Sequence, residues 1–309
     1  MKKILKHIIS LLFSYKLAIP LSYKILNEND FILNFHSIYS GYRSYQNNEI
    51  SYYNFNKFIS ELSKFYNFIS LSELGSKKKD NKKKSIILSF DDGFYDFINV
   101  LDITYKYNFK PNLNIIIKSS YSKYIPLNIL SQSILNQLPT KDRYNFDFPK
   151  INLKKIGSTN MSQKVSNIYK YFKTSAQLEI NEYIMSQSKM YGIKLPKFLN
   201  ISNLNKIKND IEIGIHSYYH SSMGVEDDDF FKKDLINSIN FINEKLNLKT
   251  NIYAFPNGSY NQSQINILKD KGFKYILMLN EKSKQFSVYS RRGAHGNSIN
   301  WVAINSFYR

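Results

Sequence analysis

Short apolar runs alternate along this chain with longer stretches whose apolar residues recur at helical spacing. The short runs predict strands of a sheet that is covered on both faces, and they lie at 31–36, 85–90, 112–117, 211–215, 251–254 and 275–279. Apolar side chains three and four positions apart predict amphipathic helices at 54–69, 97–107, 230–246 and 264–271. Strands that alternate with helices in this way favour a parallel sheet.

Two of the predicted strands end in side chains that bind metals. The strand 85–90 runs into Asp91 and Asp92, and the strand 211–215 runs into His216 and His220. Ligands of parallel α/β folds collect where the strands end, and divalent metals are commonly held by two histidines and one carboxylate. Asp92, His216 and His220 supply that set. An Asp-Asp-Gly turn on its own is equally typical of ordinary turns.

A third segment, Phe255-Pro256-Asn257-Gly258, follows another predicted strand. Together with Ser89-Phe90-Asp91-Asp92-Gly93 and His216-Ser217-x-x-His220, it resembles the polysaccharide deacetylase family, the carbohydrate esterases with a NodB-type domain. The three motifs occur in the family's order, and the resemblance covers roughly residues 28–120 and 205–300. It implies an α/β fold, an irregular (β/α) barrel.

The resemblance also implies roles for individual residues. Asp91 corresponds to the general base, while Asp92, His216 and His220 correspond to the ligands of a divalent metal ion, which we expect to be zinc. Ser217 matches a residue that stabilises its loop by hydrogen bonding. The backbone N–H of Asn257 corresponds to an oxyanion donor.

Two residues of the family pattern are missing from their usual places. The arginine that orients the base is absent near Asn257, so Arg292 or its neighbour Arg291 is predicted to replace it. The general acid is normally a histidine in a C-terminal Leu-x-Leu-His strand. Leu33-Asn34-Phe35-His36 resembles that strand, as in circularly permuted members, so His36 is predicted as the acid. His295, in a loop beside the two arginines, is the alternative acid. A purely structural role is the alternative for His36.

The family needs fewer residues between the strand that ends in Asp91 and Asp92 and the strand that ends in His216 than this chain provides. We therefore predict a deacetylase barrel at 27–309 with a mostly helical insertion at about 121–205, whose helical spacing is clearest in 165–172 and 178–190. The insertion either walls the substrate groove or decorates the periphery.

The amino-acid composition limits the binding partners and the cellular location that we expect for the protein. Cysteine is absent, which excludes disulfides and thiolate metal sites. A net charge of +19 suits an anionic membrane surface or glycan, whereas the dispersed aromatic residues match no RNA-binding motif, so no nucleic-acid partner is expected. Residues 1–26 form an amphipathic segment that is too interrupted to span a membrane. We expect a cytoplasmic protein at the inner face of the membrane; the alternative is an exported or envelope-associated one.

These features predict metal-dependent hydrolysis of the N-acetyl group of an amino sugar, in a bacterial surface or exported polysaccharide or its lipid-linked precursor. A glycoside hydrolase on the same barrel is an alternative, although it leaves His216 and His220 unexplained. A catalytically inactive sugar-binding protein is a second alternative. Release of acetate from N-acetylated sugars separates these possibilities.

Overall fold

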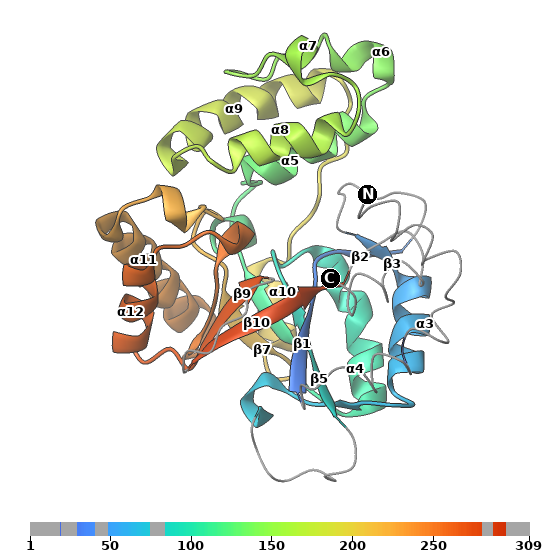
Figure 1. Ribbon diagram of the computed structural model, residues 1–309, viewed down its shortest axis with the longest axis vertical. Helices are drawn as coiled ribbons and strands as arrows, with labels where there is room; N and C mark the ends of the chain where they lie inside the picture. The colour runs from blue at the N-terminus through green and yellow to red at the C-terminus, as the bar shows by residue number, and fades with distance from the viewer. Residues whose placement is uncertain (1–18, 20–29, 41–48, 75–83, 280–286, 295–309) are drawn as a thin grey trace.

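The computed structural model describes residues 19, 30–40, 49–74, 84–279 and 287–294 (Figure 1). Most of the predicted N-terminal segment 1–26 lies outside this part of the chain, and so does His295. Within the described part, no helix is both long and apolar enough to cross a membrane.

Parallel strands close into a barrel, which confirms the predicted fold. The barrel strands are β1 (Asp30–Phe35), β5 (Ser85–Phe90), β6 (Asn112–Ile115), β7 (Glu212–Ile215), β8 (Ile252–Ala254), β9 (Tyr275–Leu279) and β10 (Val288–Gly293). Their order around the ring is β1, β10, β9, β8, β7, β6 and β5, and a pairing of β1 with β5 closes it. β4 (Asn67–Phe68) pairs with the start of β5, while β2 (Ile38–Tyr39) and β3 (Ile50–Ser51) form a separate pair.

Side chains along each barrel strand alternate between two environments, as the pleat of a strand requires. In β1, Phe31, Leu33 and Phe35 belong to the large apolar core between the strands and the surrounding helices. Ile32 belongs instead to a smaller cluster inside the barrel, and Asn34 continues the inward face. The barrel interior is therefore apolar toward one end and polar where the strands end.

The helices that surround the barrel bury one apolar stripe each against the strands. They are α3 (Tyr52–Leu62), α4 (Leu101–Tyr107), α10 (Ile201–Ile207), α11 (Asp228–Leu246) and α12 (Gln262–Asp270), and a 3-10 segment (Tyr95–Val100) leads into α4. The helix predicted at 230–246 begins with acidic residues, and one of them caps it. The Asp227 carboxylate accepts the backbone N–H of Phe230 at 2.8 Å and caps α11.

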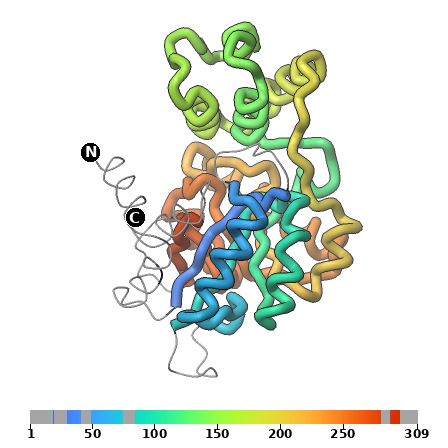
Figure 2. The backbone as a smooth tube through the Cα atoms, turned by 90° about the vertical axis from the view of Figure 1, so that its right-hand side faces the viewer, coloured from blue at the N-terminus to red at the C-terminus, as the bar shows by residue number. Residues whose placement is uncertain are grey.

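The predicted insertion is a helical unit that stands at one end of the barrel (Figures 1 and 2). It contains α5 (Leu127–Gln137), α6 (Thr140–Arg143), α7 (Leu153–Ile156), α8 (Met161–Tyr169) and α9 (Thr174–Met190), and these helices share an apolar core of their own. The predicted C-terminal limit near residue 205 overlaps the barrel, because Leu204 and Ile207 of α10 are buried in the main core.

Hydrogen bonds hold the insertion on the barrel. At the start of α9, Thr174 donates its backbone N–H to Glu226 at 2.6 Å and its hydroxyl contacts Ser221 at 2.7 Å. Before α5, the Tyr124 hydroxyl donates to the backbone carbonyl of Tyr219 at 3.0 Å. Tyr219 and Ser221 flank His220, so the insertion is attached to the loop that carries a predicted metal ligand.

Candidate metal centre and catalytic cavity

Strand register brings the segment that ends in His36 next to the segment that ends in Asp91. β1 and β5 pair residue by residue from Asp30 with Ser85 to Phe35 with Phe90. The backbone N–H of Asp91 then donates to the carbonyl of Phe35 at 3.0 Å. His36 and Asp91 therefore leave the barrel side by side, although they lie 55 positions apart in the sequence.

Asp92, His216 and His220 form a buried cluster with the spacing of metal ligands. Their potential ligand atoms all lie within 4.8 Å of one another. Oδ1 of Asp92 lies 3.5 Å from Nε2 of His216 and 3.3 Å from Nε2 of His220. Two ligand atoms at about 2.0–2.1 Å from one tetrahedral zinc ion would lie roughly 3.3–3.4 Å apart, so the cluster fits such an ion.

The protonation states of His216 and Asp92 also suit metal binding, which needs a neutral imidazole and an ionised carboxylate. Nδ1 of His216 lies 2.8 Å from the carbonyl of Ala254, which orients that nitrogen as the donor and leaves Nε2 free as a ligand. Burial lowers the pKa of His216 to about 4, so its imidazole is neutral at pH 7. Burial opposes ionisation of Asp92, but its contacts with His220 outweigh this effect and lower its pKa. Oδ1 of Asp92 is buried and has no hydrogen-bond partner among the described residues, as expected for an atom that awaits a cation.

The loop between the two histidines has its own anchor. Asp234 of α11 is buried and accepts hydrogen bonds from the Ser217 hydroxyl and from the backbone N–H of Tyr218, each at 3.0 Å. Ser217 and His220 both adopt positive φ angles of 63°, which non-glycine residues hold only where surrounding contacts enforce them. The structure thus places Ser217 in the loop-stabilising position that the sequence predicts.

Asp91 is held by an arginine and two amides. The Arg291 guanidinium donates to both carboxylate oxygens, from Nη1 at 2.6 Å and from Nη2 at 2.9 Å. Asn34 and Asn114 donate to the same carboxylate at 3.1 and 2.8 Å. Burial favours the neutral acid, but the charge and hydrogen bonds of Arg291, together with the charges of His216 and His36, outweigh it and hold the pKa of Asp91 well below its usual range. Asp91 is therefore an ionised carboxylate outside the metal-binding cluster.

The same polar network continues through the inside of the barrel. The Ser89 hydroxyl donates to the Asn112 amide oxygen at 2.7 Å, and Arg291 donates to Ser89 at 3.1 Å. Gly214 leaves room for this network, since a Cβ there would lie 2.1 Å from Oδ1 of Asn114. A larger residue at 214 would displace the amide that supports Asp91.

The structure corrects the choice of Arg292 as the residue that orients Asp91. Successive residues of a strand point to opposite faces, so Arg291 enters the barrel and Arg292 leaves it. The Arg292 guanidinium lies 5.8 Å from the ring centre of Phe31, a residue of the core outside the strands. Arg291 is therefore the arginine that contacts Asp91.

His36 and Asn257 reach the same cavity from two further strand ends. The cavity has a volume of about 110 Å³. His36 lines it with Asp91, Asp92 and both metal-cluster histidines, and Nδ1 of His36 is buried without a hydrogen-bond partner among the described residues. Asn257 follows β8 with a φ of 57°, and its side chain donates to the Ser222 hydroxyl at 3.0 Å.

The insertion supplies one wall of this cavity. Asn128, Ile129 and Gln132 of α5 and Lys170 at the end of α8 line it together with the barrel residues. Of the two placements predicted for the insertion, the structure shows the one beside the groove. None of these four residues was singled out in the sequence, because no local pattern indicates which face of an inserted helix meets a distant site.

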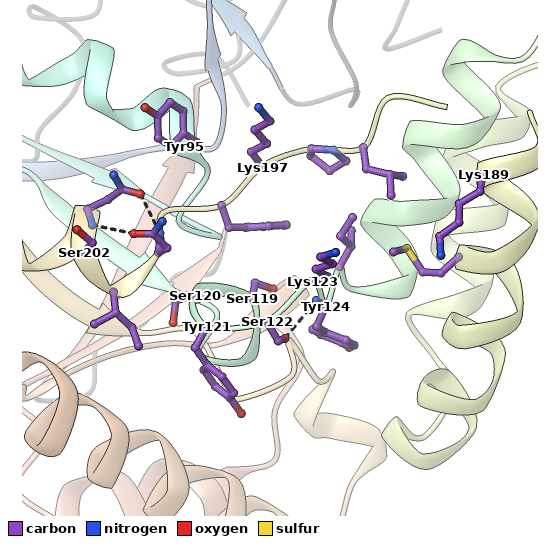
Figure 3. A pocket seen from close by; sticks show the side chains of 18 residues that line it. Tyr95, Ser119, Ser120, Tyr121, Ser122, Lys123, Tyr124, Lys189, Lys197 and Ser202 are labelled. Carbon is purple, nitrogen blue, oxygen red and sulfur yellow. Dashed lines mark hydrogen bonds between the residues drawn. The ribbon is translucent and has the colours of Figure 1, made fainter. Parts of the chain in front are cut away.

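A much larger cleft of about 1030 Å³ lies between the insertion and the barrel (Figure 3). Tyr95, Tyr121 and Tyr124 line it with Lys123 and Lys197, but the described residues around it include no carboxylate and no histidine. The groups that can perform acid, base or metal chemistry are gathered in the small cavity instead. The larger of the two cavities is therefore not the one that contains these groups.

Replacing Arg291 by Met tests the support of Asp91, and Arg292→Met on the same strand is its matched control. Loss of one partner of a buried ion pair costs about 3–5 kcal/mol, so R291M should unfold at much lower urea concentration and lose activity. R292M should lose much less unfolding free energy, since the Arg292 guanidinium faces the Phe31 ring and not Asp91. Equal losses of unfolding free energy in the two variants would contradict the network.

Comparisons with known proteins bear on the family and the fold. Residues 183–276 match the family model of polysaccharide deacetylase, a range that contains the second and third motifs. No protein with a curated description matches the chain.

Several solved structures share the fold. A deacetylase of Streptococcus pyogenes, PplD in complex with acetate, aligns at 17% identity and a TM-score of 0.57, covering 90% of this chain and 98% of that one. IcaB from Ammonifex degensii aligns at 13% identity and a TM-score of 0.58, with 91% and 97% covered. A de-N-acetylase from Aggregatibacter actinomycetemcomitans aligns at 15% identity and a TM-score of 0.53, with 87% and 95% covered. The family model thus matches a part of the chain that carries two of the three motifs, and the solved structures share its barrel fold, in agreement with the resemblance seen in the sequence.

Proposed function

We propose that the chain hydrolyses the N-acetyl group of an amino sugar in a metal-dependent reaction. Its substrate is a bacterial surface or exported polysaccharide or the lipid-linked precursor of one. The observation that carries the proposal is the content of the small cavity. A metal-ligand cluster, an ionised carboxylate outside that cluster and a histidine with a free ring nitrogen line the same space.

These groups answer the two difficulties of amide hydrolysis. An amide is a poor electrophile and water is a poor nucleophile. A divalent ion held by Asp92, His216 and His220 would polarise the carbonyl and lower the pKa of bound water toward about 7. Imidazole and carboxylate donors without thiolate suit zinc, which is the metal that we propose.

Asp91 is placed to accept the proton of the attacking water. Its ion pair with Arg291 keeps the carboxylate charged over the physiological pH range and fixes its orientation. Oδ2 of Asp91 lies 3.9 Å from Nε2 of His216, so the base stands beside the metal ligands without joining them. General-base assistance of this kind contributes roughly 10²–10⁴-fold to a rate.

His36 is placed to protonate the departing amine. It lines the cavity with Asp91. No described residue forms a hydrogen bond with its Nδ1, so no such bond fixes the tautomer of the ring. Asn257 stands at the rim of the same cavity, where its backbone N–H would stabilise negative charge on the carbonyl oxygen. His295 stays the alternative acid.

The site favours this reaction over glycoside hydrolysis. Glycosidases use two free carboxyl groups that flank the sugar, whereas Asp91 is bound to Arg291 and Asp92 faces two histidines. An inactive sugar-binding protein would have no need for an ionised carboxylate beside a cluster with the spacing of metal ligands. Acetate release from N-acetylglucosamine oligomers, measured with and without a chelator, tests the proposal against both alternatives.

We further propose that the protein acts at the inner face of a membrane, bound through the amphipathic segment 1–26 and its basic residues. The support is the sequence pattern and the net charge of +19. Flotation of the full chain with anionic vesicles, compared with a chain that lacks residues 1–22, tests this location. Equal flotation of the two proteins would refute it.

Metal binding and proton transfer should separate in two variants. His216→Ala removes a ligand, so metal analysis should find little zinc and activity should disappear. Asp91→Asn keeps all three ligands, so it should retain zinc while acetate release falls by at least about a hundredfold. Near wild-type turnover of D91N would show that Asp91 is not the base.

His36→Ala should lower acetate release at least about a hundredfold and leave the zinc content unchanged, because His36 acts on the leaving amine and not on the metal. His36→Gln keeps a polar side chain of similar size and cannot carry the proton, so it should lose as much. Full activity in both variants would transfer the role to His295 or to water.

A further inference from the structure

Lys170 brings a positive charge into the catalytic cavity from the insertion. It follows α8, is half-buried, and lines the cavity together with Asp91, Asp92 and His216. Its ammonium has no ion-pair or hydrogen-bond partner among the described residues. Burial lowers its pKa, while the more distant charge of Asp92 opposes that effect. An ammonium without a partner is costly to bury, so its placement there needs a reason.

The two carboxylates that line the cavity, Asp91 and Asp92, already have other partners. Asp91 is bound through both oxygens to Arg291, and Asp92 belongs to the metal-ligand cluster. Lys170 comes from the insertion and not from the barrel segments that carry these two carboxylates. It is therefore available to a group that the substrate brings, and a cation there favours an anion.

The insertion also brings a neutral donor to this cavity. Asn128 of α5 is 7% exposed and lines the cavity, and its side-chain amide makes no hydrogen bond to the described residues. Asn128 and Lys170 thus offer an N–H donor and an ammonium toward the same space. This combination recognises the oxygen atoms of a phosphate or carboxylate through charge-assisted hydrogen bonds.

The wall is held in position. The Gln132 amide of α5 donates to the Ser166 hydroxyl of α8 at 2.8 Å, one turn before Lys170. The hydroxyl of Tyr169 donates to the carbonyl of Pro149 at 3.0 Å. Four residues after Lys170, Thr174 is bound to Glu226 of the barrel. The backbone that carries Lys170 is thus tied on both sides, as a preorganised binding site requires.

We propose that Lys170 and Asn128 form a subsite for an anionic group, a phosphate or a carboxylate, that the amino sugar carries close to its N-acetyl group. The inference rests on the proposed function, because it assumes that the sugar binds between this wall and the metal-ligand cluster. The cavity of about 110 Å³ is much smaller than the roughly 300–1,000 Å³ of pockets for drug-sized ligands. It suits one acetamido group with its neighbouring substituent better than a run of sugar units.

Binding of reaction products tests the subsite without turnover. Zinc-loaded full-length protein is titrated calorimetrically with glucosamine, glucosamine 1-phosphate and muramic acid, which add no charge, a phosphate and a carboxylate to the amino sugar. The wild type should bind one of the charged sugars at least about tenfold more tightly than glucosamine. The preferred sugar identifies which anion the site accepts.

Lys170→Met should abolish this preference and leave the affinity for glucosamine unchanged. Lys170→Arg should retain part of it, and Asn128→Ala should weaken it. Lys155→Met, at an exposed lysine of α7 in the same insertion, is the matched control and should behave as the wild type. Zinc content and melting temperature verify the fold of each variant, and K170R and N128A carry the test if K170M does not fold.

Equal affinity of the wild type for charged and neutral sugars would overturn the subsite, and so would a K170M variant that weakens all three sugars alike. A Lys170-dependent preference in a protein that releases no acetate from any N-acetylated sugar would leave the subsite standing and refute the proposed function. The two failures are therefore distinguishable.

Discussion

The ion pair between Arg291 and Asp91 links β10 with the end of β5, the two strands that flank β1 in the ring, and it keeps the proposed base ionised. Arg291 lies on β10 and Asp91 follows β5, while Asn34 of β1 bonds to both side chains from the strand between them. A buried carboxylate and a buried guanidinium are each costly to remove from water, and only a complete set of partners offsets that cost. The polar residues inside the barrel supply these partners. Closure of the barrel and ionisation of Asp91 thus depend on the same contacts.

The position of β1 explains how the proposed acid can come from an early strand. β1 pairs with β10 on one side and with β5 on the other, so it is the strand that completes the ring. In a closed barrel the contacts of a strand depend on its neighbours in space and not on its place along the chain. A histidine after β1 therefore reaches the same edge as a histidine after a final strand would, and His36 lies beside Asp91 for this reason.

Much of this arrangement could be predicted from the sequence, because strand ends and motif residues are local features. The strands before Asp91 and His216 and the helix at α11 follow directly from apolar periodicity. The choice between Arg291 and Arg292 depended on the register of β10, and a shift of one residue reverses the face of a strand. The amides of Asn34 and Asn114 were not singled out, yet alternation offered a signal: each lies two positions from another polar residue in an otherwise apolar strand.

The position of the insertion relative to the cavity could not be predicted from the sequence. Helical spacing revealed its helices, but the approach of Lys170 to Asp92 depends on contacts between segments far apart in the chain. The bonds from Tyr124 to Tyr219 and from Thr174 to Ser221 and Glu226 fix the insertion to the loop of His220. That loop also carries His220, a member of the candidate metal cluster. The cavity wall that the insertion supplies and this cluster are therefore joined by hydrogen bonds, so we expect changes to the insertion to act on both.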